Sequence, residues 1–187
     1  FLEEAARLGE LAVLLWSDET LHQLTGHAPK FPLAERHYFL DAVRYVSRVV
    51  PLAAGADVHT LPALDGFQPQ VWVDETAEVN PARQTYCQRH MLEYRVLPAA
   101  QMGGFPTPPP VPSAPGRKKV IVTGCYDWFH SGHVRFFEEV SGYGDLHVIV
   151  GHDANIRLLK GEGHPLLPQA ERRYLVGSIK YVQQALI

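Results

Sequence analysis

The sequence predicts an α/β protein whose parallel strands carry helices on both faces, built as two related and incomplete repeats. Three observations support this prediction. Residues 118–151 read as strand, helix and strand, the pattern that builds parallel sheets. The two ends of the chain resemble each other, and a stretch rich in Pro and Gly at 101–117 separates them. The chain is therefore expected to hold two copies of one α/β unit.

The elements after the linker follow from local patterns. Residues 118–124 are a short β-branched run closed by Gly, typical of a buried parallel strand entering a turn. A helix over 133–140 and a strand over 146–151 should follow and complete a right-handed βαβ unit. A further helix is expected over 170–179, because that segment follows a Pro and carries apolar residues at helical spacing.

The internal similarity is the most informative feature of the chain. Residues 1–4 match residues 136–139 without a gap, and residues 34–36 match residues 170–172 after one added residue near Pro29 to Pro32. Coincidence does not readily explain identities at polar positions. These identities include Asp18 with Asp153, Glu35 with Glu171 and Arg36 with Arg172.

Two repeats joined by a linker are expected. The first repeat spans 1–100 and should lack the strand and histidine turn that open the second; a semi-rigid Pro/Gly-rich linker spans 101–117. The second repeat spans 118–187 and should lack its C-terminal part. The later elements of the first repeat are expected as strands at 70–73 and 93–97 with a helix at 83–90.

Composition limits the classes of function. The chain is 46% hydrophobic and 20% charged, with a formal charge of -3, which gives no reason to expect a nucleic acid partner. No apolar run is long enough to cross a bilayer and no signal peptide is evident, so we expect a cytoplasmic protein without a membrane partner. Cys87 and Cys125 lie far apart and suggest neither a metal motif nor a disulfide framework.

Among ten histidines, only His130 and His133 have a spacing with chemical meaning. They flank Gly132 at the expected start of a helix, where free backbone N–H groups bind phosphate and imidazoles add donors. Two other interpretations remain open. The pair could bind zinc together with Cys125 or Asp127, or it could be purely structural.

Residues 123–133, Thr-Gly-Cys-Tyr-Asp-Trp-Phe-His-Ser-Gly-His, resemble the first motif of the cytidylyltransferase-like nucleotidyltransferase family, written G-x-F-D-x-x-H-x-G-H. Asp153, Lys160-Gly161 and Glu171-Arg172 are also similar to that family, and the resemblance covers essentially all of residues 118–187. It implies a Rossmann-like fold. The tandem layout resembles that of the phosphoethanolamine cytidylyltransferases within the family.

The resemblance implies transfer of a nucleotidyl group, with CMP favoured, from a nucleoside triphosphate (CTP or ATP) to a phosphorylated alcohol or sugar, with release of pyrophosphate. Mg²⁺ would accompany the triphosphate. His130, His133 and Lys160 would be catalytic, and no protein metal site is expected. Asp127 is expected to cap or form a turn, Asp153 could merely close a turn, and the arginines could be a solvated helix face. The implied nucleotide- and phosphate-binding residues are Thr123, Gly124, Cys125, Tyr126, Gly132, Asp153, Arg172 and Arg173.

The first repeat departs from the family pattern, because Thr25 stands where the second has Lys160 and no Ser/Thr-rich motif follows. We therefore expect it to be degenerate or structural. The alternatives to a CMP transferase are an adenylyltransferase of the same family and a non-catalytic nucleotide-binding or scaffolding module. A class I aminoacyl-tRNA synthetase fragment is disfavoured, because the chain is short, acidic and without a Lys-Met-Ser-Lys-Ser segment. The chain alone is expected to be weakly active, and strand exchange could produce a homodimer.

Overall fold

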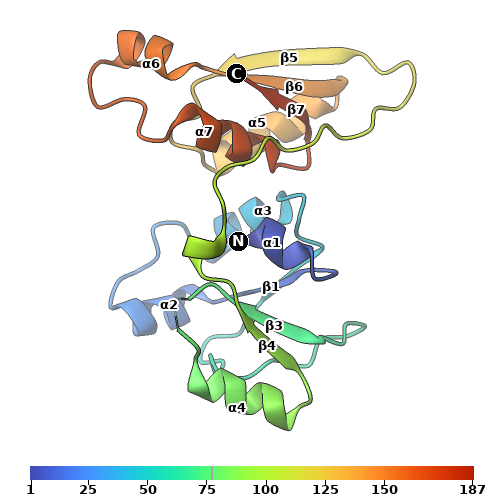
Figure 1. Cartoon of the computed structure of the whole chain (residues 1–187), viewed down its shortest axis with the longest axis vertical. Helices are drawn as coiled ribbons and strands as arrows, with labels where there is room; N and C mark the ends of the chain where they lie inside the picture. Colours follow the sequence, from blue (N-terminus) through green and yellow to red (C-terminus); the bar gives the residue numbers. More distant parts are fainter. Residues whose placement is uncertain (77) are drawn as a thin grey trace.

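The computed structural model describes residues 1–76 and 78–187 (Figure 1). The chain is an α/β protein with Rossmann-like parallel sheets flanked by helices, as the sequence predicts. Strands pair as β1-β2, β3-β4 and β5-β6-β7, and every ladder is parallel. No helix among the described residues is both long and apolar enough to cross a membrane.

Five consecutive elements of the first part of the chain, in the order helix, strand, helix, helix and strand, recur in the second part. In the first part of the chain the elements are α1 (Leu2–Ala6), β1 (Ala12–Leu15), α2 (Asp18–Thr25), α3 (Leu33–Asp41), β2 (Arg48–Pro51), β3 (Val71–Asp74), α4 (Pro81–Arg89), β4 (Glu93–Val96) and the 3-10 helix η1 (Ala99–Gln101). In the second part they are β5 (Lys119–Gly124), α5 (Ser131–Ser141), β6 (Asp145–Val150), α6 (Asp153–Lys160), α7 (Gln169–Gly177) and β7 (Val182–Leu186).

The core of the second repeat lies between its sheet and helices α5 and α7. Val134 and Phe137 of α5 and Val148 of β6 are fully buried there. Ile121 and Ile149 are 64% and 36% exposed. Side chains alternate between the two faces of a strand, so these residues mark the other face of the sheet. That face, which the sequence predicts to be covered by helices, is open at these positions.

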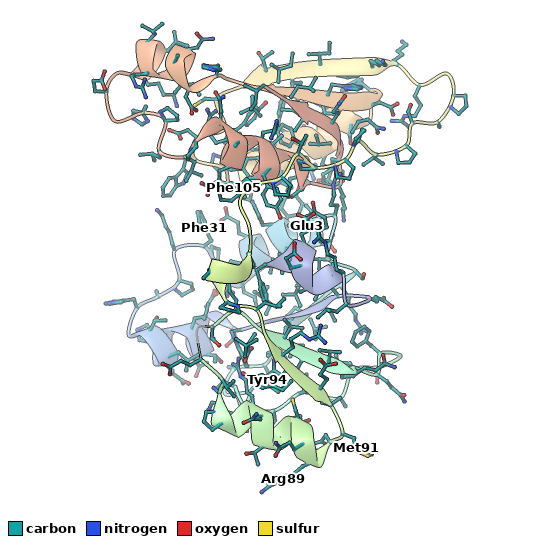
Figure 2. All side chains as sticks on the ribbon, in the orientation of Figure 1. Glu3, Phe31, Arg89, Met91, Tyr94 and Phe105 are labelled. Atoms are coloured by element: carbon teal, nitrogen blue, oxygen red, sulfur yellow. The ribbon has the colours of Figure 1, made fainter. Side chains whose placement is uncertain are left out.

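The linker packs along the second repeat. Phe105 lies against Tyr174 of α7 with ring centroids 5.7 Å apart (Figure 2). Further along, the backbone N–H of Val111 donates to the carbonyl of Gln183 in β7 at 3.0 Å. These contacts give the Pro-rich segment a defined path, which suits its stiff composition.

The two repeats meet through equivalent segments. The backbone N–H of Arg44 donates to the carbonyl of Ser178, and that of Lys180 donates to the carbonyl of Ala42, both at 2.8 Å. Arg44 is the repeat equivalent of Lys180, and Ala42 is that of Ser178. The two bonds are therefore related by a local two-fold axis, as in a contact between identical subunits.

Side chains repeat the same symmetry. Glu138 of α5 accepts hydrogen bonds from Tyr38 at 2.6 Å and Tyr181 at 3.1 Å. Burial and the bond to Glu138 raise the pKa of Tyr38 to about 12. The equivalent carboxylate, Glu3, lies where the repeats join (Figure 2), and together with burial it raises the pKa values of its two neighbouring tyrosines. The two tyrosines beside Glu3 are Tyr45, the equivalent of Tyr181, and Tyr174, the equivalent of Tyr38.

Candidate active site

The two histidines of the motif lie at the turn between β5 and α5. His130 is the N-cap of α5, and its Nδ1 accepts a hydrogen bond from the backbone N–H of Gly132 at 3.0 Å. His133 sits in the first turn, and its Nδ1 accepts from the backbone N–H of His130 at 3.4 Å. The pair forms a reciprocal cap, a device normally made by Ser or Thr with Glu or Gln.

This cap fixes the tautomer of both rings. Because Nδ1 accepts a bond from an N–H group in each ring, the proton of the neutral imidazole belongs on Nε2. Both Nε2–H groups are then left for a ligand, and the ring centroids of His130 and His133 are only 4.1 Å apart. The positive end of the α5 helix dipole lies at the same turn, so the turn can present two imidazole donors to one anion.

Aromatic residues hold the second histidine in place. The ring of Phe129 stacks on His133 with centroids 5.5 Å apart, and Tyr126 meets it edge-on at 5.4 Å. Burial first, and then the neighbouring His130, lower the pKa of His133 below its usual value. His133 is therefore a neutral donor near pH 7.

Close packing explains the glycine that ends β5. A Cβ on Gly124 would lie 2.5 Å from the ring of Tyr126, so no larger residue fits. Tyr126 is only 5% exposed and has a positive φ of 53°. Its side chain belongs to the core and takes no part in an open binding surface. It shapes the turn, and its role in nucleotide binding stays a prediction.

Asp127 joins the histidine turn to the loop that follows Lys160. Its buried carboxylate accepts bonds from the backbone N–H groups of Leu166 at 2.6 Å and Leu167 at 3.1 Å, and it lies 3.0 Å from Nδ1 of His164. Burial alone raises the pKa of Asp127, but these hydrogen bonds outweigh it, so the pKa is lowered. Asp127 ties two loops together, a more distant role than the local cap or turn expected.

Arg172 is fully buried and bonded to the protein itself. Its guanidinium donates to the carbonyls of Cys125 at 2.5 Å, Gly151 at 2.8 Å and Leu167 at 2.9 Å, and to Oδ1 of Asp153 at 2.5 Å. These bonds give Arg172 a structural role, and its contact with phosphate stays a prediction. Arg172 holds three loops at the carboxyl ends of β5 and β6 together. Asp153 is 31% exposed, and its contact with ribose stays a prediction.

The remaining predicted residues lie at the surface or its edge. Lys160 is the last residue of α6 and is exposed, and Thr123 is exposed on β5. Arg173 is half-buried, and its Nε is buried without an acceptor among the described residues. Their roles in binding phosphate stay predictions. For the zinc interpretation, the described residues contain no group of three or more His, Cys, Asp or Glu side chains placed to hold a metal ion.

Sequence reasoning missed a contribution of the first repeat to this turn. Glu35 of α3 accepts a hydrogen bond from the hydroxyl of Ser131, the residue between His130 and Gly132. Phe39 of α3 meets Phe129 edge-on, with ring centroids 5.8 Å apart. The partners lie far apart in the sequence, and no local pattern signals such a pairing.

Comparisons with known proteins agree with this geometry. Residues 121–187 match the sequence profile of the family described as cytidylyltransferase-like. Bifunctional protein HldE of Geobacter metallireducens is 37% identical over 75 residues, which cover 40% of this chain and 15% of that protein. The protein of the same name from Aliarcobacter butzleri is 37% identical over 73 residues, covering 38% and 15%. FAD synthase of Ferroglobus placidus is 42% identical over 71 residues, covering 37% and 45%. The match thus spans less than half of each relative.

Proposed function

We propose that the protein transfers a nucleotidyl group from a nucleoside triphosphate to a phosphorylated small molecule, because residues 121–187 match the sequence profile of the family described as cytidylyltransferase-like. The observation that carries the proposal is the pair of Nε2–H donors on His130 and His133 at the N-terminus of α5. Both groups are fixed before any ligand binds, so little reorganisation is needed during the reaction.

The reaction is a displacement at the α-phosphorus. An oxygen of the acceptor phosphate attacks that atom, a new P–O–P linkage forms, and the bond to the oxygen that bridges to the β-phosphate breaks. Pyrophosphate leaves with the electron pair. An ionised phosphate oxygen is already a nucleophile, so no general base is required, and the protein acts by positioning and by stabilising charge.

The histidines provide that stabilisation. Negative charge grows on the bridging oxygen and on the non-bridging oxygens as pyrophosphate departs. The Nε2–H donors of His130 and His133 and the positive end of the helix dipole would stabilise the oxygens that bear this charge. The exposed ammonium of Lys160 would contribute a further point charge to the phosphates.

Mg²⁺ belongs to the proposal as the counter-ion of the triphosphate. The carboxylates nearest the turn are engaged, since Asp127 accepts two backbone N–H bonds and Asp153 pairs with Arg172. Mg²⁺ keeps several waters and is commonly held through substrate phosphates, so this site fits a metal that arrives with the triphosphate. There it would neutralise charge on the phosphate oxygens.

Replacement of either histidine tests the catalytic role. His130→Ala and His133→Ala should each lower kcat on the order of 10²-fold, with a smaller effect on KM, because the donors meet charge that develops in the transition state. Pyrophosphate release measures the rate. His22→Ala, which changes an exposed histidine of α2, is the matched control and should retain full activity. Near wild-type turnover by both alanine variants of the turn would refute the proposed role.

The base of the nucleotide needs its own experiment. Residues 126–129, Tyr-Asp-Trp-Phe, favour CMP transfer, whereas the relative named FAD synthase favours a second candidate, adenylyl transfer, since FAD contains an AMP unit. Thermal-shift titration with CTP and with ATP, each with Mg²⁺, separates them. A ligand at 100 times its Kd adds about 2.7 kcal/mol to stability. Binding of either triphosphate without pyrophosphate release would instead support the non-catalytic alternative.

A further inference from the structure

A loop of the first repeat runs beside the histidine turn of the second. This loop joins α2 to α3 and reaches the end of the first repeat that faces the second (Figure 1). Nζ of Lys30, in the loop, lies 4.2 Å from the ring centroid of Trp128. In the first turn of α3, Glu35 accepts a hydrogen bond from the hydroxyl of Ser131. His130 lies between Trp128 and Ser131 in the chain, so the two contacts flank it on both sides.

Lys30 forms no ion pair among the residues that the structure describes. Its exposed ammonium lies over the face of Trp128, while the carboxylate of Glu35 is engaged by Ser131. Trp128 is itself 55% exposed, and a cation–π contact is weak at an exposed site. A phosphate oxygen forms a stronger, charge-assisted hydrogen bond with an ammonium group. The charge of Lys30 is therefore available to an anion.

The junction of the two repeats does not itself require a lysine at this position. Phe31 and Leu167 are counterparts, since the carbonyl of each accepts a hydrogen bond from the buried arginine of its repeat. Lys30 directly precedes Phe31, so its counterpart is Leu166, which is exposed and apolar. The local two-fold axis thus relates a lysine on one side to a leucine on the other. The lysine is the residue that lies beside the histidine turn.

The ammonium of Lys30 can reach an anion at that turn. Trp128 and His130 are two positions apart, so their Cα atoms lie at most about 7 Å from each other. A lysine carries its charge on a flexible stem of four carbons. Rotation of the exposed Lys30 side chain can therefore move the ammonium from the ring of Trp128 toward phosphate oxygens held by the two histidines.

We infer that Lys30 is a substrate-binding residue of the site in the second repeat, where its ammonium leaves the face of Trp128 and contacts a phosphate group of a substrate held at the histidine turn. The inference rests on the proposed function, which supplies the phosphate groups. Trp128 keeps the ammonium beside the turn before the substrate arrives, so less side-chain freedom is lost on binding. The first repeat thereby contributes a positive charge that the second repeat does not carry at the equivalent position.

The indole N–H signal of Trp128 in NMR spectra reports the movement, and Trp128→Phe assigns that signal by its loss. Pyrophosphate and inorganic phosphate, titrated separately into the full chain, are the probes. Lys30→Met should weaken the binding of at least one of them by about tenfold, because a charge-assisted contact is lost. The shift of the Trp128 signal on binding should shrink with it. Weaker binding of pyrophosphate identifies the triphosphate as the source of the phosphate group, and weaker binding of inorganic phosphate alone identifies the acceptor.

Two variants make the test specific to the charge at this position. Lys30→Arg keeps both the charge and the contact with the ring, and should restore most of the affinity. Lys119→Met, at the exposed start of β5 and so at the opposite end of that strand from the turn, is the matched control and should bind both anions like the wild type. If Lys30→Met bound both anions as tightly as the wild type, the inference would be overturned and the proposed function would stand. If the wild-type chain bound neither anion, both would be overturned.

Discussion

The neutral state of His133 is a prediction about one residue that can be measured without turnover. Its pKa lies below 6.5 because burial and His130 both disfavour the imidazolium form. The unfolded chain binds more protons than the folded one between the lowered pKa and about 6.5, so stability falls as the pH falls through that window. A bound triphosphate has the opposite effect on the ring, because its negative charge favours the imidazolium.

NMR titration of the histidine ring protons tests both parts. We expect a midpoint for His133 below 6.5 in the free protein and an upward shift when pyrophosphate is added. His22, exposed on α2, is the internal control and should shift little. A titration midpoint of His133 above 6.5 in the free protein would contradict the prediction of a buried, neutral donor. A midpoint that does not change when pyrophosphate is added would contradict anion binding at this turn.

A second prediction at the scale of residues tests whether Arg172 stabilises the fold or binds phosphate. Arg172→Met leaves buried carbonyls and the Asp153 carboxylate without their donor, and should destabilise the protein by about 3 to 5 kcal/mol. Urea unfolding measures the change. Arg157→Met, at an exposed arginine of α6, should change stability by less than about 0.5 kcal/mol. Wild-type stability with lost triphosphate binding would restore the phosphate-binding role to Arg172.

At the scale of elements, local sequence patterns predicted the positions of strands and helices. The strand expected at 118–124 is β5 at Lys119–Gly124, and the helix expected at 133–140 is α5 at Ser131–Ser141. A β-branched run and its flanking glycines determine both. The helix starts two residues earlier than expected because His130 acts as its N-cap. The sequence does not predict this cap, since N-caps are normally Ser, Thr, Asp or Asn.

Contacts between elements that are distant in the chain could not be predicted from local sequence patterns. The pattern around Arg172 fits an exposed helical arginine as well as a buried one, and only the meeting of three loops decides between them. The same holds for Glu35, whose partner Ser131 belongs to another repeat. Asp127 looked like a local turn residue, yet its acceptor positions are filled from Leu166 and Leu167. Local chemistry names the candidate residues, but tertiary packing assigns their roles.

At the scale of the whole molecule, the first repeat supports the site of the second. Helix α3 packs on α5, and its contacts reach the turn residues Phe129 and Ser131. The local two-fold axis relates the similar segments of the two halves, which nevertheless differ in sequence. We therefore expect the first repeat, even if degenerate, to stabilise the conformation of the HxGH turn.

The bond between Tyr38 and Glu138 tests that coupling, because it joins α3 of the first repeat to α5 of the second at 2.6 Å. Tyr38→Phe and Glu138→Gln should each destabilise the chain, and the double variant should lose about 1 kcal/mol less than the sum of the two, since both remove one charge-assisted hydrogen bond. Urea unfolding of the four proteins gives the coupling energy. Glu4→Gln, on the exposed side of α1, should combine additively with Tyr38→Phe. If the losses of unfolding free energy for Tyr38→Phe and Glu138→Gln were additive, this hydrogen bond would not couple the first repeat to α5.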